Sequence, residues 1–274
     1  MINQAQFDAI KTVVVKAGSI LREGWLNPQL IVYETKKDGS LVSNYDRKSE
    51  AIMLAELPAI IPDIPLIAEE EDAAGVKKEY SSLYCTIDPL DGTRSYLSEK
   101  RGLEAKRGFA TLLAIVENGK TTAAVVYSPV HNILISAMHG VHKVEKVLPD
   151  GTLVPFTPPP RTDDKVLRVA FNRTATQDYA EENYFGKLRE AGYTISYDKN
   201  PDQFTRLVQA ALGELDFYFA DGSAARSWDV APFDLLLAAQ GGKFWSETKL
   251  DDAYGTHHHF IAGRDRKLLD LILP

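Results

Sequence analysis

The spacing of hydrophobic residues predicts two helices at the start of the chain. Over residues 4–24 apolar side chains recur every three or four positions, which is the period of an amphipathic helix, and Asn27-Pro28 ends the segment. Ser43 is a suitable N-cap for a second helix, which is expected to run to about residue 57 and to stop before Pro58.

Runs of apolar and β-branched residues predict strands next. Residues 64–68 and 83–87 are short apolar strands, and each leads directly into acidic residues. A strand-rich block extends from residue 109 to residue 147, in which Asn118-Gly119 supplies a hairpin turn. The polar, basic stretch between Thr93 and Phe109 is expected to be a mobile loop with one helical turn.

A proline-rich segment at residues 157–164 predicts a linker, after which strands and helices alternate. Expected strands lie at residues 166–170, 193–197, 215–219, 244–245 and 260–261, and expected helices at 177–191, 202–212, 230–240 and 264–271. The predicted domains are therefore an N-terminal α+β half over residues 1–156 and a C-terminal α/β half over residues 165–274.

Composition narrows the class of protein. A hydrophobic fraction of 45% and a charged fraction of 25% are typical of a soluble globular protein. The net charge of −7 argues against a nucleic acid polymer as the main partner, because that requires a basic face. No apolar run approaches the roughly 18 residues of a membrane helix. A single cysteine and the lack of a secretory signal predict a cytoplasmic location.

The segment Asp88-Pro89-Leu90-Asp91-Gly92-Thr93 is the strongest chemical signal. Pro89 is expected to end the strand, so that the two aspartates flank a turn and can point to the same side. Gly92 allows close backbone approach, and a helical turn starting near Thr93 would offer free N–H groups to a phosphate. The alternative is a surface turn with N-capping aspartates.

Three further acidic features accompany this segment. Glu69-Glu70-Glu71-Asp72 ends the preceding strand, where a shared hard cation would relieve the mutual repulsion of the carboxylates. A solvated acidic loop is the alternative. Asp229 in Trp-Asp-Val-Ala precedes an apolar helix, and Asp46 lies on the first turn of its helix, so helix capping is the alternative role for both.

The order of these motifs resembles the inositol monophosphatase superfamily. Paired glutamates after a strand, D-P-L-D-G-T about 19 residues further on, and W-D-x-A followed by a helix and Gly241-Gly242 are its pattern, and the similarity extends over most of the chain. The resemblance implies a layered αβαβα sandwich of the inositol monophosphatase and fructose-1,6-bisphosphatase type, with the site where the two halves meet.

The resemblance also implies a role for individual residues. The implied ligands of two or three Mg²⁺ ions are Glu69, Asp88, the carbonyl group of Leu90, Asp91 and Asp229. Gly92 and Thr93 would bind the phosphate through backbone N–H groups, while Asp46 and Thr93, assisted by Glu70, would activate the attacking water. Lys36 and Asp221 would contact the substrate.

The implied activity is Mg²⁺-dependent phosphomonoester hydrolysis by metal-activated water, with inositol monophosphate or a similar small sugar phosphate as substrate. A 3′(2′),5′-bisphosphate nucleotidase acting on 3′-phosphoadenosine 5′-phosphate is the alternative, because Thr93-Arg94-Ser95-Tyr96-Leu97 resembles that branch. A catalytically silent protein that binds phosphorylated ligands is an alternative of another class. The expected partner is a small phosphorylated substrate, without nucleic acid or membrane, and relatives are commonly homodimers.

Several other residues are assigned ordinary roles. Cys85 is expected to be a core thiol, His257-His258-His259 an exposed loop, and Lys100 to Arg107 a solvated basic loop. Arg226 is expected either to meet a second phosphate or to form a surface salt bridge.

Overall fold

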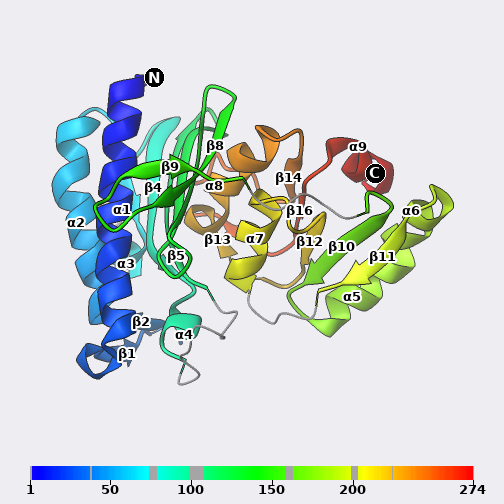
Figure 1. Ribbon diagram of the computed structural model, residues 1–274, viewed down its shortest axis with the longest axis horizontal. Helices are drawn as coiled ribbons and strands as arrows, with labels where there is room; N and C mark the ends of the chain where they lie inside the picture. Colours follow the sequence, from blue (N-terminus) through cyan, green and yellow to red (C-terminus); the bar gives the residue numbers. More distant parts are fainter. Residues whose placement is uncertain are drawn as a thin grey trace.

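Helices and sheets stack along the long axis of the protein in the order helix, sheet, helix, sheet, helix (Figure 1). The computed structural model describes residues 2–37, 39–73, 79–98, 108–157, 163–198, 203–223 and 225–273. The outer helices on one side are α1 (Gln4–Leu26) and α2 (Asn44–Ile60), the middle ones α7 (Gln203–Ala211) and α8 (Ser227–Ala238), and those on the other side α5 (Thr174–Ala180), α6 (Gly186–Glu190) and α9 (Arg266–Ile272). This arrangement confirms the predicted layered αβαβα sandwich.

The first two helices begin where the sequence predicts. Asn3 caps α1, and Ser43 caps α2 through a reciprocal pair of hydrogen bonds with Asp46. The prediction that α2 stops before Pro58 is wrong, because the helix continues to Ile60. Pro58 lies in the last turn, where it removes one hydrogen bond, and the buried side chain of Leu57 keeps this turn packed in the core.

A seven-stranded sheet follows the order of the sequence. Its strands are β3 (Leu66–Ala68), β4 (Leu83–Asp91), β5 (Ala110–Glu117), β6 (Lys120–Ser128), β7 (Ile133–Met138), β8 (Val141–Val147) and β9 (Leu153–Pro155). Strands β3 and β4 are parallel, and the remaining neighbours are antiparallel. Asn118 and Gly119 have φ values of 52° and 71°, which confirms the predicted hairpin turn between β5 and β6. A short hairpin of β1 (Tyr33–Thr35) and β2 (Leu41–Ser43) precedes α2.

Strand β4 contains a β-bulge at the predicted motif. Asp88 lies opposite Leu112 and Asp91 opposite Ala110, so three steps along β4 match two steps along β5. The prediction that Pro89 ends the strand is therefore wrong. Proline cannot donate to a ladder, but a bulge interrupts the ladder where Pro89 lies, so the strand continues to Asp91.

The second sheet has five strands and lies beyond α7 and α8 (Figure 1). In spatial order they are β11 (Thr194–Tyr197), β10 (Val166–Phe171), β12 (Phe217–Ala220), β16 (Phe260–Gly263) and β14 (Lys243–Ser246). The first three are parallel, whereas β16 is antiparallel to both of its neighbours. A small two-stranded ladder pairs β13 (Ala225–Arg226) with β15 (Thr256–His257) at the start of α8.

The helical run on the outer face of this sheet begins three residues earlier than predicted. It passes from α5 through a π-helical turn at Glu181–Phe185 into α6. Buried residues fill the space between successive layers, with α8 packed between the two sheets. Within the described ranges, no helix is both long enough and apolar enough to cross a membrane. The predicted linker lies largely outside the described residues, since residues 158–162 are not among them.

Candidate active site

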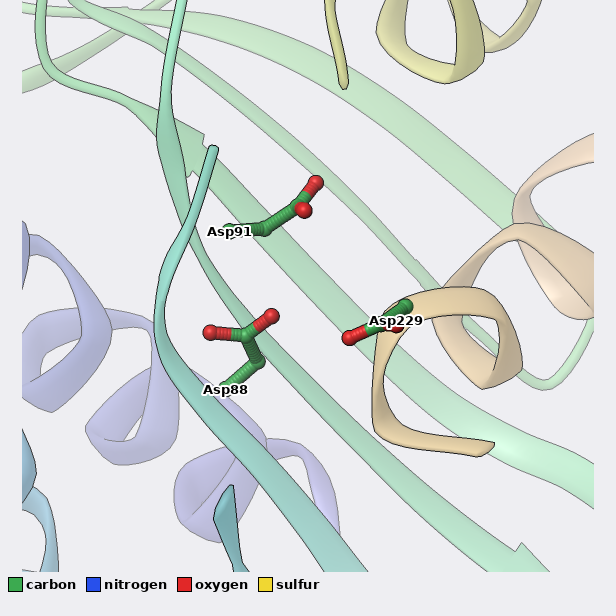
Figure 2. A group of neighbouring side chains, drawn as sticks. All are labelled: Asp88, Asp91 and Asp229. Carbon is green, nitrogen blue, oxygen red and sulfur yellow. The ribbon is translucent and has the colours of Figure 1, made fainter. Parts of the chain in front are cut away.

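Three aspartates from distant parts of the chain form an acidic cluster. Asp88 and Asp91 lie on β4 and Asp229 lies on the first turn of α8, and their carboxylate oxygens come within 4.8 Å of one another. Figure 2 shows the three side chains turned toward a common space. The fold thus brings together carboxylates that lie about 140 residues apart in the sequence, as the predicted metal site requires.

The bulge in β4 explains why Asp88 and Asp91 act together. In a regular strand, residues three apart point to opposite faces of the sheet, and the extra residue of the bulge returns both to one side. The backbone N–H of Leu90 donates to Oδ1 of Asp88 over 2.9 Å. The carbonyl group of Pro89 accepts hydrogen bonds of 3.1 Å from the hydroxyl groups of Ser49 and Thr111. These contacts hold the bulge in one conformation.

Asp229 serves as a capping residue and also faces the cluster. Its Oδ2 accepts a hydrogen bond of 2.7 Å from the backbone N–H of Arg226, which is the N-cap of α8. A carboxylate can accept several bonds, so this leaves accepting capacity directed at Asp88 and Asp91. Asp229 can therefore cap α8 and take part in the acidic cluster at the same time.

Asp46 combines the same two features on α2. Its Oδ2 accepts from the backbone N–H of Ser43 over 2.9 Å and from the Ser43 hydroxyl over 2.5 Å. Its Oδ1 accepts from the Thr93 hydroxyl over 3.2 Å. Burial raises the pKa of Asp46 to about 6, although the bonds from Ser43 oppose this change. The capping bonds thus orient Asp46 toward Thr93, the residue with which it is predicted to activate the attacking water.

The backbone turns sharply between Asp91 and Thr93. Gly92 has φ = +90° and is the N-cap of α4 (Thr93–Tyr96), a single helical turn. A Cβ atom at Gly92 would lie 3.1 Å from the carbonyl oxygen of Gly108, so a side chain there would be both strained and crowded. The buried ring of Tyr96 anchors the turn. The first N–H groups of a helical turn have no partner within it, as phosphate binding requires.

The acidic run after β3 is helical, and its first two glutamates are ion-paired. It forms α3 (Glu69–Ala73), and Nζ of Lys36 lies 3.2 Å from Oε1 of Glu69 and 2.7 Å from Oε1 of Glu70. The backbone N–H of Glu70 donates to Oε2 of Glu50 over 2.9 Å. Burial alone would lower the pKa of Lys36, but the charges of Glu69 and Glu70 outweigh it and raise the pKa above its usual value. These contacts argue against a solvated loop at Glu69 and Glu70.

Burial and mutual repulsion make ionisation of the clustered carboxylates unfavourable. Burial, followed by the charge of Glu69, raises the pKa of Asp88, of Asp229 and of Glu70 above the usual range. A divalent cation bound by these groups would remove this cost. All the donors are carboxylate oxygens, which are the ligands that Mg²⁺ prefers over nitrogen or sulfur. The residues present therefore fit a magnesium site.

Asp221 directly follows β12, and other side chains already contact its carboxylate. Arg173 approaches it at 3.1 Å, and His259 contacts its second oxygen. The contact of Asp221 with substrate stays a prediction. Arg226 donates to the carbonyl group of Tyr254 over 3.1 Å and to a hydroxyl group, so it has internal partners in place of a surface salt bridge.

The ordinary roles assigned from the sequence are correct for Cys85 and wrong for His257. Cys85 is fully buried in β4, as expected of a core thiol. His257 is also fully buried, whereas His258 and His259 are exposed. The pairing of β13 with β15 draws His257 inward, a tertiary contact that the polar loop sequence does not reveal. The predicted basic loop at Lys100 to Arg107 lies outside the described residues.

Sequence reasoning missed Glu50. This carboxylate is buried beside Glu70, and burial raises its pKa to about 7. One signal was available, because Glu50 lies four residues after Asp46 and therefore on the same face of α2.

An αβαβα sandwich with a carboxylate cluster at the junction of its layers defines a class of metal-dependent phosphatases. The sequence profile described as the inositol monophosphatase family matches residues 3–274, so the chain belongs to this family. Its members are metal-dependent phosphoric monoester hydrolases, which is the enzyme class of this protein.

Individual relatives agree with this assignment. The chain is 27% identical to the Nus factor SuhB of Pasteurella multocida over 267 residues, covering 94% of this chain and 90% of that protein. It is 32% identical to the 3′(2′),5′-bisphosphate nucleotidase CysQ of Salmonella typhimurium over 124 residues, covering 45% and 48%. The crystal structure of CysQ from Bacteroides thetaiotaomicron superposes with a TM-score of 0.68 at 18% identity, covering 95% of this chain and 98% of that chain.

Proposed function

We propose that this protein hydrolyses the phosphate ester of inositol or of a similar small sugar, using two or three Mg²⁺ ions. The observation that carries the proposal is the convergence of Asp88, Asp91 and Asp229 within 4.8 Å beside the hydrogen-bonded pair of Asp46 and Thr93. The ligand set would consist of these three aspartates, Glu69 and the carbonyl group of Leu90. The two predicted halves of the chain would each contribute ligands.

The residues around the cluster have distinct chemical tasks in this proposal. Bound Mg²⁺ would neutralise charge on the phosphoryl oxygens and acidify the attacking water. The Thr93 hydroxyl has two acceptors within reach, Oδ1 of Asp46 at 3.2 Å and the carbonyl oxygen of Leu90 at 3.1 Å. With its hydrogen directed at Asp46, its oxygen would accept a hydrogen bond from that water. Asp46, with a pKa of about 6, then accepts a proton through Thr93 as the water attacks phosphorus. The alkoxide leaving group takes up a proton from solvent.

Glu70 and Lys36 would support this arrangement through their contacts with Glu69 and Glu50. Lys36 holds both Glu69 and Glu70, and Glu50 fixes the backbone of Glu70. Glu70 would assist at a third metal or orient the attacking water. Gly92 and Thr93 would offer their backbone N–H groups to the phosphate at the start of α4.

The second candidate is a 3′(2′),5′-bisphosphate nucleotidase. It is favoured by the 32% identity to CysQ, which exceeds the 27% identity to SuhB although it covers less than half of the chain. The two candidates share the metal site and the water-activating pair. They differ in the group that carries the phosphate, which Asp221 would contact in either case.

The test is phosphate release from a panel of inositol monophosphate, 3′-phosphoadenosine 5′-phosphate and fructose 1,6-bisphosphate, each with Mg²⁺ and with EDTA. We expect Mg²⁺-dependent turnover, with the highest kcat/KM for inositol monophosphate. Preference for the bisphosphorylated nucleotide would select the second candidate. Turnover in EDTA, or full activity of Asp91→Asn, would contradict the proposed metal site. Mg²⁺-dependent ligand binding without turnover would favour the silent alternative.

A further inference from the structure

The start of α8, which carries Asp229, is hydrogen-bonded to residues 252–255, the segment that precedes β15. The backbone N–H of Ser227 donates to the carbonyl group of Gly255 over 3.1 Å, and its hydroxyl donates to the carbonyl group of Asp252 over 2.6 Å. The guanidinium group of Arg226 donates to the carbonyl group of Tyr254. The position of the helix start is therefore set by a loop distant in sequence rather than by α8 alone.

His257 is a buried residue at these contacts between the start of α8 and residues 252–255. Its Nε2 lies 3.3 Å from the hydroxyl oxygen of Ser227, and its Nδ1 lies 2.8 Å from the hydroxyl oxygen of Ser246. Its backbone pairs with Ala225 in the ladder between β13 and β15. Burial lowers the pKa of His257 to about 4, so the ring is neutral at neutral pH. Both ring nitrogens thus need a defined partner, one as donor and one as acceptor.

The hydrogen bonds of the two serines assign the tautomer. The single hydroxyl hydrogen of Ser227 is directed at the carbonyl group of Asp252, so its oxygen must accept from His257. The ring therefore carries its hydrogen on Nε2, and Nδ1 accepts from the hydroxyl of Ser246. The carbonyl group of His259 is a longer alternative acceptor for that hydroxyl, at 3.2 Å. Ser246 thus donates to His257, His257 donates to Ser227, and Ser227 donates to the carbonyl group of Asp252, so each donor in this series has an acceptor.

We propose that His257 is a positioning residue for the metal site, whose neutral Nε2–H tautomer fixes Ser227 and, through the first turn of α8, the carboxylate of Asp229. The inference rests on the proposed function, in which Asp229 is a metal ligand. Removing the donor would leave the buried hydroxyl oxygen of Ser227 without the hydrogen bond that it accepts, and would weaken the set of contacts that positions the turn. Metal sites tolerate displacements of only about 0.5 Å in their ligands, so Mg²⁺ affinity reports such a shift directly.

The experiment compares two substitutions of His257 whose amide side chains differ in length. In His257→Asn the shorter amide reaches only the position of Nδ1, whereas in His257→Gln the amide reaches the position of Nε2 and can donate to Ser227. Mg²⁺ affinity of the EDTA-stripped protein is measured by calorimetry, and KM for Mg²⁺ is separated from kcat. We expect Mg²⁺ binding about tenfold weaker in His257→Asn, with KM for Mg²⁺ rising more than kcat falls, and substantial recovery in His257→Gln.

Ser246→Ala is the matched control, because it removes the bond to the other ring nitrogen and leaves Ser227 in contact with His257. It is expected to lower the melting temperature with little change in Mg²⁺ affinity. The proposal is overturned if His257→Asn binds Mg²⁺ within about twofold of the parent while melting lower, since the ring would then be structural only.

Two further variants distinguish failure of the proposal for His257 from failure of the proposed metal site. If His257→Asn does not fold, Ser227→Ala removes the acceptor with a smaller change in volume, and unaltered Mg²⁺ affinity in that variant overturns the proposal. Asp229→Asn tests the proposed function independently. If it binds Mg²⁺ as tightly as the parent, the proposed ligand set is wrong, whatever the result at His257.

Discussion

The hydroxyl group of Thr93 donates to Oδ1 of Asp46 over 3.2 Å, and this bond joins the start of α4 to the start of α2. The same hydroxyl lies 3.1 Å from the carbonyl oxygen of Leu90, so one side chain connects the predicted base to the β4 bulge. Ser43 holds the other oxygen of Asp46. The pair is therefore oriented before any ligand arrives.

Thr93→Val is expected to lower kcat by about 10²- to 10⁴-fold, the usual contribution of general acid–base groups, because it removes the hydroxyl that links the water to Asp46. Mg²⁺ affinity is expected to change little. Steady-state kinetics at saturating Mg²⁺ provide the measurement, and Thr93→Ser, which keeps the hydroxyl, is the control. Equal kcat values for Thr93→Val and the parent would exclude this role.

Asp88→Asn is expected to stabilise the metal-free protein and to abolish metal binding. The carboxylate is buried near Glu69, Asp91 and Asp229, and its raised pKa shows that ionisation is unfavourable there. At pH 8 in EDTA, neutralising it should therefore raise the free energy of unfolding. Thermal melts with EDTA and with Mg²⁺ provide the measurement. Asp63→Asn, on the surface, is the control, and a less stable Asp88→Asn protein would contradict the interpretation.

Lys36→Met is expected to destabilise the metal-free protein by about 3 kcal/mol, since it leaves Glu69 and Glu70 without their shared cation. Added Mg²⁺ should then raise the melting temperature more than in the parent, because the ion compensates the freed carboxylates. Lys16→Met is the matched control, since Lys16 pairs with Glu56 at the exposed surface. Equal effects of the two substitutions would show that the ion pairs of Lys36 contribute little.

The raised pKa of Glu50 predicts that the stability of the metal-free protein depends on pH. Burial raises its pKa from the usual 4.5 to about 7, so the folded protein binds the proton more tightly than the unfolded chain does. The contribution of Glu50 to stability is therefore fully present below about pH 4.5 and is lost as the pH rises through 7. Urea denaturation in EDTA between pH 4.5 and 8 should show a declining free energy of unfolding.

Glu50→Gln should flatten part of this decline and stabilise the metal-free protein at pH 8 by roughly 1–2 kcal/mol. Its amide oxygen can still accept from the backbone N–H of Glu70, so the fold of α3 is retained. Glu56→Gln, on the exposed side of the same helix, is the control. An unchanged pH profile for Glu50→Gln would assign the titration to other carboxylates.

Gly92→Ala is expected to reduce activity and to cost about 1–3 kcal/mol of stability, because the site combines φ = +90° with a carbonyl oxygen 3.1 Å from the new Cβ. Gly151→Ala is the matched control, since Gly151 has φ = +84° but nothing within 4 Å of a Cβ atom. The difference between the two variants isolates the crowding at Gly92. Chemical denaturation and kcat for both variants provide the comparison.

Local chemistry determined the elements that the sequence predicts well. The capping box of Ser43 and Asp46, the Asn118-Gly119 turn and the apolar periods of the helices depend on residues close in the chain, so their signals are readable without a fold. The order of the acidic motifs identified the family for the same reason. Pro58 and Pro89 misled the prediction, because packing in α2 and a bulge in β4 accommodate residues that isolated segments would not.

Only the tertiary structure decided how the acidic residues are held. The burial of Glu50 behind Glu70, the bond of Lys36 to two glutamates and the inward position of His257 all depend on contacts between segments distant in sequence. Charge and hydrogen-bond satisfaction in a buried site depend on what surrounds each group in space. The sequence by itself therefore determined the family and the candidate residues of the site, and the packing of α2, β4 and α8 determined how those residues are buried, oriented and supported.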